Sequence, residues 1–429
     1  MLIRHTLFNL VGLGAPLLVA VVAIPLLVTA LGDARFGLLT LIWAVVSYFG
    51  LFDLGLGRAL THHLARELSR SELARPGPMV WTALCAMAAL GLFAGLLLAA
   101  GADWGVGWIR HVPDVDEARR AVWAMAVAMP FTVLTTGLRG VLEATHAFGV
   151  INAIRLPMGL FTFVGPLAVV WAGDGGLDTM AWVLAGGRVI ACAVHAVYAR
   201  RALGAAAADL RFDASALRPL LGSAGWMTLS NTISPLMNYI DRFVIGATLS
   251  AGAVAHYATP HEMITKLSIL PGALTAVLFP RFSAQIAQRD VDARRVYRLS
   301  LLALAVALLP VAVVLSIWAK PLLAWWIAPA FAEQSAPVLT ILVWGMVATC
   351  MAMIPFTVLQ SAGNARLTAI LHLVELPFYL LGLWWMIGQH GLAGAAAAWT
   401  LRNVIDGLLL AAFAAPVLRR LGRGVGQPA

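Results

Sequence analysis

The most regular feature of this sequence is the alternation of long apolar runs with short polar segments. Each apolar run is about twenty residues long, which is enough for an α-helix to cross roughly 30 Å of hydrocarbon. The pattern therefore predicts an all-α, polytopic membrane protein. Its twelve predicted spans lie at residues 9–31, 36–57, 79–101, 121–142, 157–173, 178–199, 220–245, 252–279, 299–319, 336–358, 368–388 and 391–416.

Composition agrees with this fold class. Of the 429 residues, 61% are hydrophobic and only 11% are charged. A soluble protein of this length could not cover its surface with so few charges. The first apolar run is longer than the apolar region of a typical signal peptide, so we expect it to be the first span.

Basic residues are distributed unevenly between the two sets of predicted loops. If the N-terminus is cytoplasmic, twenty of the 29 Lys and Arg residues fall in cytoplasmic segments and five fall on the opposite side. The positive-inside rule then predicts that both termini are cytoplasmic. The same distribution explains most of the net charge of +9, so no nucleic-acid partner is required.

An internal repeat divides the chain. The pentapeptide PFTVL occurs at 130–134 and 355–359, in spans four and ten, and a helix with a Leu-Pro pair follows each copy. This predicts a duplication of six spans with a pseudo-twofold axis along the membrane normal. The predicted domains are a six-helix bundle at 1–200, a cytoplasmic linker at 201–218, a second bundle at 219–418 and a tail at 419–429.

Charged residues inside the spans need partners or water, because each costs at least about 2.5–3.5 kcal/mol to insert. Two pairs are spaced i,i+4 on one helix face: Glu262 with Lys266, and Arg402 with Asp406. Asp241 and Arg242 are adjacent and so point in different directions. The pairs could fix helix packing or line a water-filled cavity, and the Gly and Pro residues in these spans favour the cavity.

Arg188 and Glu375 have no obvious local partner. Arg188 follows two glycines about ten residues into span six, near the membrane midplane. Guanidinium suits bidentate phosphate contacts, so we predict that Arg188 binds an anion, with an interhelical salt bridge as the alternative. At the inner end of span two, Arg58 can reach the cytoplasmic headgroups, whereas Asp53 is expected to cap or pair inside the membrane.

No motif of soluble catalysis accompanies these charges. The three cysteines, Cys85, Cys192 and Cys350, lie in apolar spans without metal-ligand spacing. The sequence contains no Walker A loop, HExxH or GxSxG motif. We therefore predict no catalytic residue, cofactor or metal, and a function other than that of an enzyme.

Three stretches carry a resemblance to a known family. They are LGDARFGLLTLIWAVVSYFGLFDLGLGRALTHHLARE, LRGVLEATHAFGVINAIRLPMG and SNTISPLMNYIDRFVIGATLS, of which GLFDLGLGRA and YIDRFVIG are the most specific parts. The chain resembles, over nearly its whole length, the O-antigen-type oligosaccharide flippases of polysaccharide biosynthesis. These belong to the multidrug/oligosaccharidyl-lipid/polysaccharide exporter superfamily.

The resemblance implies two six-helix bundles around a cavity that opens alternately to each side of the bacterial inner membrane. Its implied substrate is a polyprenyl-pyrophosphate-linked oligosaccharide that moves to the periplasmic leaflet; membrane lipids and polysaccharide polymerase machinery are the expected partners. The predicted headgroup-binding cations are Arg188, Arg402, Lys266, Arg242 and Arg58. The acids predicted to couple ions or to pair are Asp53, Asp241, Glu262, Glu375 and Asp406.

Two other functions remain open. A multidrug or cation antiporter of the related branch would favour unpaired acids and few bases, but acids and bases are nearly balanced within these spans. A membrane polysaccharide polymerase or ligase usually needs a large external loop or a catalytic acid motif, and the predicted external loops are short.

Overall fold

The computed structural model describes residues 2–49, 53, 55–70, 76–204, 209, 211–217, 220, 233 and 236–421. Within these ranges the regular structure is entirely helical, as the sequence predicts. The chain forms two compact units. The N-terminal unit comprises Met1–Tyr239 with Ser250–Val254, and the C-terminal unit comprises Ile240–Leu249 with Ala255–Ala429.

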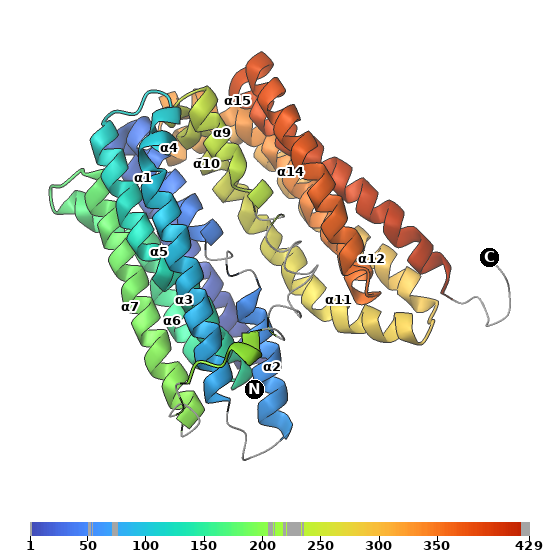
Figure 1. Cartoon of the computed structure of the whole chain (residues 1–429). Coiled ribbons are helices and arrows are strands. Elements are labelled where there is room, and N and C mark those ends of the chain that lie inside the picture. Colours follow the sequence, from blue (N-terminus) through green and yellow to red (C-terminus); the bar gives the residue numbers. More distant parts are fainter. Residues whose placement is uncertain are drawn as a thin grey trace. The chain divides into compact units, whose positions relative to one another are not determined.

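The N-terminal unit is built around a central helix, α5, which packs on α2, α3 and α7, while α1 packs on α6 (Figure 1). Small residues let these helices approach closely: a Cβ added at Gly91 of α3 would lie 2.7 Å from the Pro130 Cα of α5. The helices of this unit are α1 (Leu2–Phe49), α2 (Leu56–Arg70), α3 (Gly77–Ala100), α4 (Ala102–Trp108), α5 (Val115–Ala144), α6 (Phe148–Trp171) and α7 (Leu177–Leu203).

The C-terminal unit has α14 at its centre, packed on α11, α12, α13 and α15. A single 3₁₀ turn, η2 (Lys266–Ser268), joins α10 to α11, and α9 contacts α15. The helices of this part of the chain are α9 (Ile240–Thr248), α10 (Ala251–Thr265), α11 (Ile269–Ala287), α12 (Asp292–Ile317), α13 (Ala319–Trp326), α14 (Pro329–Ser361) and α15 (Ala365–Arg419). The first turn of α10 belongs to the N-terminal unit.

The two longest helices are each interrupted by a glycine. Gly32 in α1 has φ 70° and ψ 166°, and Gly391 in α15 has φ 56° and ψ −133°, so each helix consists of two segments. A straight helix would separate His372 from Asp406 by about 50 Å, yet their side chains are 3.5 Å apart. The chain therefore folds back at Gly391, which is where the sequence predicts the boundary between spans eleven and twelve.

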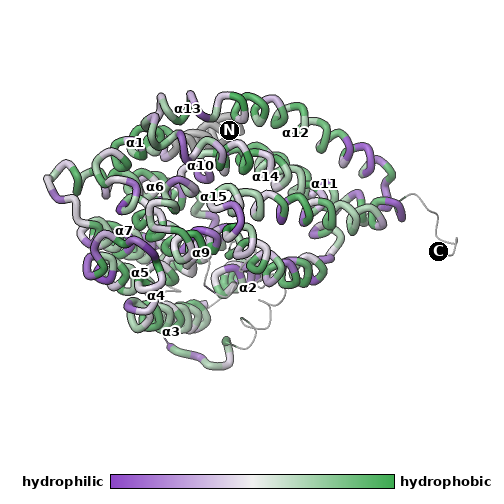
Figure 2. The backbone as a smooth tube through the Cα atoms, turned by 90° about the horizontal axis from the view of Figure 1, so that it is seen from above, coloured by the Kyte–Doolittle hydropathy of each residue, from purple (hydrophilic) through white to green (hydrophobic). Residues whose placement is uncertain are grey.

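The long apolar helices confirm the prediction of a multi-pass membrane protein. Nine described helices are long and apolar enough to span, taking α10 with α11 as one and α1 and α15 as one each. Large apolar side chains such as Leu92, Phe93 and Leu96 are exposed on α3, and most turns of the long helices are hydrophobic (Figure 2). Span seven, predicted at 220–245, falls largely outside the described residues, so the count of twelve stays a prediction.

Two details differ from the sequence-based elements. Span two was expected to continue to residue 57, but α1 ends at Phe49 and α2 starts at Leu56, with Gly55 at φ 76° before it. Asp53 therefore lies between two helices. The short helices α4 and α13 were not predicted, because seven or eight residues that follow a longer apolar helix give no separate hydropathy signal.

The order of elements repeats in the two halves: a long helix, a short one, a long one, a tight turn and another long helix. After α5 the Ala147 N–H bonds to the Leu142 carbonyl, and after α14 the Asn364 N–H bonds to the Leu359 carbonyl. His146 and Gly363 occupy the same left-handed position in these turns. The two PFTVL copies lie in the corresponding helices α5 and α14 but at different distances from their ends: Pro130 is about four turns before the end of α5, and Pro355 is about two turns before the end of α14. The predicted domain boundaries stay a prediction.

Capping defines where α5 and α7 begin. An Asp114 carboxylate oxygen accepts the Glu117 N–H at 3.0 Å. Hydrogen bonds from the backbone N–H groups of Glu117 and Asp116 hold the pKa of Asp114 below its usual range. The Glu117 carboxylate accepts the first N–H of α7, from Leu177, and pairs with Arg35 at 3.0 Å. One buried carboxylate thus joins α1, α5 and α7 at one end of the N-terminal unit.

Candidate functional site

A cluster of charges lies where α9 meets α10, with Asp241 and Arg242 buried and Glu262 and Lys266 partly exposed. We call these four residues the α9–α10 cluster. Arg242 is 2% exposed, and its Nη2 donates to Glu262 Oε1 at 2.9 Å. Lys266 Nζ donates to the other Glu262 oxygen at 3.3 Å, so the predicted i,i+4 contact is present. Glu262 is thus neutralised from two sides, and a direct phosphate contact with Arg242 would have to displace it.

Asp241 is fully buried beside this pair, with different partners. Its Oδ2 accepts the Tyr257 hydroxyl at 2.6 Å, and its Oδ1 accepts the Arg242 backbone N–H at 2.8 Å. The Asp241 carboxylate also lies close enough to Arg402 for an electrostatic interaction. Adjacent residues on one helix therefore reach separate partners, as their predicted directions require.

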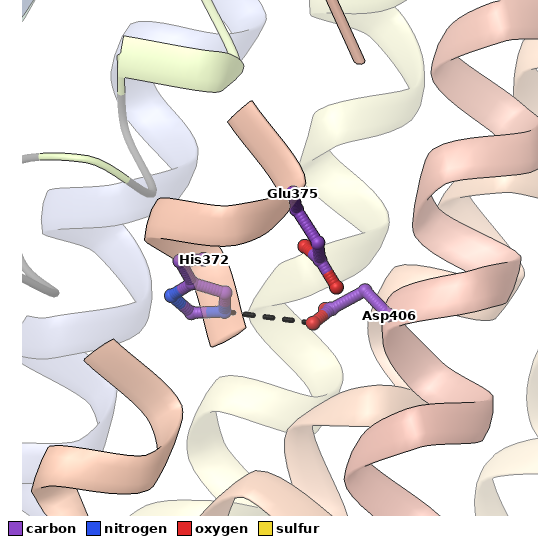
Figure 3. Close-up of side chains that lie close together, drawn as sticks. All are labelled: His372, Glu375 and Asp406. Atoms are coloured by element: carbon purple, nitrogen blue, oxygen red, sulfur yellow. Dashed lines mark ion pairs between the residues drawn. The ribbon is translucent and has the colours of Figure 1, made fainter. Parts of the chain in front are cut away.

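A second group of charges gathers inside α15, and we call His372, Glu375, Arg402 and Asp406 the α15 cluster. His372 and Glu375 are one turn apart on the first segment, and Asp406 faces them from the second segment (Figure 3). The His372 Nε2 is 3.5 Å from Asp406 Oδ1, and Arg402 Nε is 3.9 Å from Glu375 Oε2. Each of the four residues is no more than 8% exposed.

The pairing in the α15 cluster corrects one expectation. Arg402 was expected to pair with Asp406 at i,i+4, and Glu375 was expected to lack a partner. The close contacts instead join Arg402 to Glu375, and His372 to Asp406. The reversal at Gly391 places Glu375 against the second segment, so a contact across the hairpin replaces the local one.

Three residues of the α15 cluster carry donor atoms suited to a metal ion, but the positive charge of Arg402 beside them disfavours one. Donor atoms of His372, Glu375 and Asp406 all lie within 4.8 Å of one another. A histidine nitrogen with two carboxylates suits divalent transition metals. However, the Arg402 guanidinium is already 3.9 Å from Glu375 and would repel a divalent ion.

Arg188 differs from these residues. It lies about 17 Å along α7, a helix roughly 40 Å long, and no hydrogen bond or ion pair joins it to the residues that the structure describes. Its side chain is only half-buried. An added Cβ at Gly187 would collide with the Phe161 ring, whereas one at Gly186 would meet nothing within 4 Å. Gly186 is two residues before Arg188 and points about 200° away from it, so this open side of α7 is not the side that carries Arg188.

Arg58 lies on the rim of a groove between α2 and α5. This groove has a volume of about 600 Å³ and is lined by Arg58, Thr61, His62, Ala65, Arg66, Ser69 and Glu143. Nearby, the Asp53 carboxylate accepts the backbone N–H groups of Gly55 and Gly57 and the Thr136 hydroxyl at 2.9–3.2 Å. Asp53 thus has the geometry of a helix cap at the start of α2.

The predicted site residues fall into three groups. Arg242, Lys266, Asp241 and Glu262 meet in the α9–α10 cluster, Arg402, Glu375 and Asp406 meet in the α15 cluster, and Arg188, Arg58 and Asp53 belong to the N-terminal unit. Sequence reasoning missed four partners of these charges: His261 beside Arg242, Tyr257 on Asp241, His372 on Asp406, and the Tyr379 ring beside Arg402. The position of His372 three residues before Glu375 was an available signal, because that spacing places both on one helix face.

The sequence of this chain is similar to those of known proteins over most of its length. Residues 26–336 match the family model described as Polysaccharide biosynthesis protein. A Shigella flexneri protein named "Putative O-antigen transporter" is 31% identical over 411 residues, which cover 95% of this chain and 96% of that protein. The chain belongs to the polysaccharide biosynthesis protein family. The family predicted from the sequence is therefore confirmed.

Solved structures show which fold this family member shares. An inward-facing multidrug resistance MATE family transporter of the MOP superfamily superposes with a TM-score of 0.82 over 97% of this chain and 99% of that one, at 15% identity. A MOP superfamily transporter from Pyrococcus furiosus gives a TM-score of 0.66 over 98% and 96%, also at 15% identity. At such identities the likeness shows the fold alone.

Proposed function

We propose that this protein is an alternating-access flippase of the bacterial inner membrane. Its substrate would be a polyprenyl-pyrophosphate-linked oligosaccharide that moves from the cytoplasmic to the periplasmic leaflet. The relative from Shigella flexneri supports this proposal, because it is named as an O-antigen transporter and aligns with 95% of the chain. The helical fold supports it too, since structures of MOP superfamily transporters share it.

The observation that carries the proposal is Arg188. A guanidinium near the middle of a spanning helix is costly unless a partner or water meets it, and no described residue supplies an ion pair. A pyrophosphate is a suitable partner, because guanidinium donates two parallel hydrogen bonds to phosphate oxygens.

The other predicted cations differ in the partners that they have in this structure. Arg58 and Arg66 line the groove between α2 and α5 and would offer further phosphate contacts. Arg242, Lys266 and Arg402 already face carboxylates of the C-terminal unit. In this proposal Arg188 and Arg58 bind the headgroup first, while the paired cations keep their acids neutralised until the unit rearranges.

The proposal includes the predicted topology: twelve spans in two six-helix halves, with both termini cytoplasmic. The repeated order of helices, the matching turns after α5 and α14 and the unequal distribution of basic residues support it. Membrane lipids and the polysaccharide polymerase machinery would be the partners that deliver and consume the substrate.

The test uses the full chain reconstituted into liposomes with a sugar-labelled polyprenyl-pyrophosphate oligosaccharide. The quantity measured is the rate at which label in the inner leaflet becomes accessible to an impermeant enzyme added outside. We expect acceleration over empty liposomes, a large loss in Arg188→Ala and partial retention in Arg188→Lys. Arg211→Ala is the matched control, because the Arg211 side chain is 88% exposed and pairs with the nearby Asp209.

Each outcome decides something. A well-folded Arg188→Ala variant that flips at the wild-type rate would exclude Arg188 as the headgroup site. If the wild-type protein accelerates nothing, with or without an ion gradient, the flippase proposal fails. Drug or cation antiport would then be tested by dye efflux, and a polymerase or ligase by chain extension of the labelled oligosaccharide.

A further inference from the structure

The α15 cluster contains more acids than permanent cations. Glu375 and Asp406 are both acids, whereas Arg402 is the one side chain of the four that cannot lose its positive charge. In the neighbouring α9–α10 cluster the numbers are equal, with Asp241 and Glu262 beside Arg242 and Lys266. Within the almost completely buried α15 cluster, the acids therefore outnumber the permanent cations by one.

The two carboxyl groups also lack donors. Both Glu375 oxygens and Asp406 Oδ1 are buried without a geometrically sound hydrogen bond among the described residues. A Glu375 carboxyl oxygen nevertheless lies within 4.8 Å of one of Asp406. Two ionised carboxylates cannot donate to each other, so this approach is favourable only when a cation or a proton lies between them.

The surroundings determine which cation fits. A divalent ion would leave the cluster with a net positive charge beside Arg402, and histidine is a poor ligand for sodium, which prefers oxygen. A single proton restores neutrality and supplies the missing hydrogen-bond donor.

The elements that pack on α15 are α9 and α14. Their titratable or charged groups are Asp241 and Arg242 on α9 and Glu333 and Cys350 on α14, and α15 itself also carries Arg366, Tyr379, His390 and Arg419. Asp241 and Arg242 belong to the α9–α10 cluster, and Glu333 pairs with Lys320. Arg366 and Arg419 lie near the two ends of α15, at least about 9 Å along the helix from His372 and Asp406. Among the described ion pairs, the one permanent cation that reaches either carboxyl group is therefore Arg402.

We propose that Glu375 and Asp406 bind one proton between them as a hydrogen-bonded carboxyl–carboxylate pair. His372 and Arg402 position the pair from opposite ends, at 3.5 Å from Asp406 and 3.9 Å from Glu375. Loss of the proton leaves an uncompensated charge, so release requires water or another positive charge to reach α15. This site does not depend on the flippase proposal, because it concerns proton binding by the resting protein.

The experiment is infrared titration of the full-length protein in lipid nanodiscs, following the carbonyl stretch of protonated carboxyl groups. We expect the wild type to show this band at neutral pH and to lose it as the pH rises. Glu375→Gln and Asp406→Asn should each remove it, because Arg402 balances the single carboxylate that remains. Arg402→Met should increase the band about twofold, because two carboxylates without a cation require two protons. Asp116→Asn, at a 72% exposed side chain, is the control and should leave it unchanged.

Other results would overturn the proposal. A stoichiometric divalent metal in elemental analysis, lost in Asp406→Asn, would make the cluster a metal site. Disappearance of the band when choline chloride is replaced by sodium chloride would make it a sodium site. A band retained in both amide variants, or absent from a folded wild type, would show that these carboxyl groups share no proton. Thermal melting of each variant confirms that it is folded.

Discussion

The N-terminal and C-terminal units share an order of helices but have opposite interiors. In the N-terminal unit α3 packs on α5 nearly backbone to backbone, and an added Cβ at Gly95 would lie 2.5 Å from the Ala126 carbonyl oxygen. Its one buried charge on a described helix is Glu117, at the end of α5. The C-terminal unit instead buries Asp241, Arg242, Glu375, Arg402 and Asp406 within its helices.

This contrast shows that one helical plan can be stabilised in two ways. Close packing of small residues gives contacts that change little with pH or ions. A buried polar interior depends on keeping every charge balanced, so its stability and shape respond to protons and to charged ligands. The interior of the C-terminal unit is therefore where we expect changes of protonation to act, and the packed contact of α3 with α5 is where we expect rigidity.

The strongest test of the polar interior is Arg242→Met. Removing this cation leaves Glu262 with only the half-exposed Lys266, and breaking a buried pair in this way costs about 3–5 kcal/mol. We expect a clear fall in melting temperature of the purified protein. Lys266→Met is the matched comparison, since it removes a partly exposed partner of the same carboxylate and should cost less than about 1 kcal/mol. Equal falls in melting temperature for the two variants would show that the buried cation contributes no more to stability than the partly exposed one.

The close packing is tested next by Gly91→Ala. The new methyl group would lie 2.7 Å from Pro130 Cα, and such overpacking typically costs about 1–3 kcal/mol. Gly105→Ala in α4 is the control, because its Cβ would meet nothing within 4 Å. If the melting temperatures of the two variants agree, α3 and α5 are not packed as described.

A smaller effect is expected for the cap at Asp53. Asp53→Ala removes the acceptor for the Gly55 and Gly57 N–H groups, which should cost about 1 kcal/mol. Asp53→Asn keeps an acceptor oxygen and should lie between the alanine variant and the wild type in thermal melting. Were transport abolished in Asp53→Asn while the melting temperature stayed normal, Asp53 would have a role beyond capping.

The final prediction concerns the side of the membrane on which α4 and α13 lie, and its substitutions are not expected to change stability. In a background without the native cysteines, Gly107→Cys in α4 and Trp325→Cys in α13 occupy corresponding places in the two halves, and both positions are exposed. An impermeant thiol reagent should label both from the periplasmic side, and Gly149→Cys only after permeabilisation. Labelling of Gly107→Cys and Trp325→Cys from opposite sides would exclude a parallel duplication.

Hydropathy alone predicted most of the helices, because a spanning segment is defined by its length and apolarity rather than by its neighbours. It also located the breaks near Gly32 and Gly391, where polar residues and glycine interrupt the apolar pattern. The repeat was predicted from the PFTVL copies, although these lie at different distances from the ends of their helices. The matching turns after α5 and α14 are better support, and their backbone hydrogen bonds are not visible in a sequence.

The partners of the charges were harder to predict. Local spacing found the contact between Glu262 and Lys266, because both lie within adjacent turns. It missed the pairing of Arg402 with Glu375, because a reversal of the chain brings these residues together. The cap at Asp53 was anticipated as one alternative, but its acceptance of two backbone N–H groups depends on the left-handed Gly55 that precedes α2.

The reversal at Gly391 also has a consequence for how the protein is made. The two segments of α15 form a hairpin that contains His372, Glu375, Arg402 and Asp406. A segment entering the bilayer alone would expose each charge to lipid, at a cost of about 2.5–3.5 kcal/mol per residue. When the hairpin enters as one piece, its acids and its arginine are already in contact. The last two spans can therefore be inserted during synthesis without waiting for the rest of the chain to assemble around them.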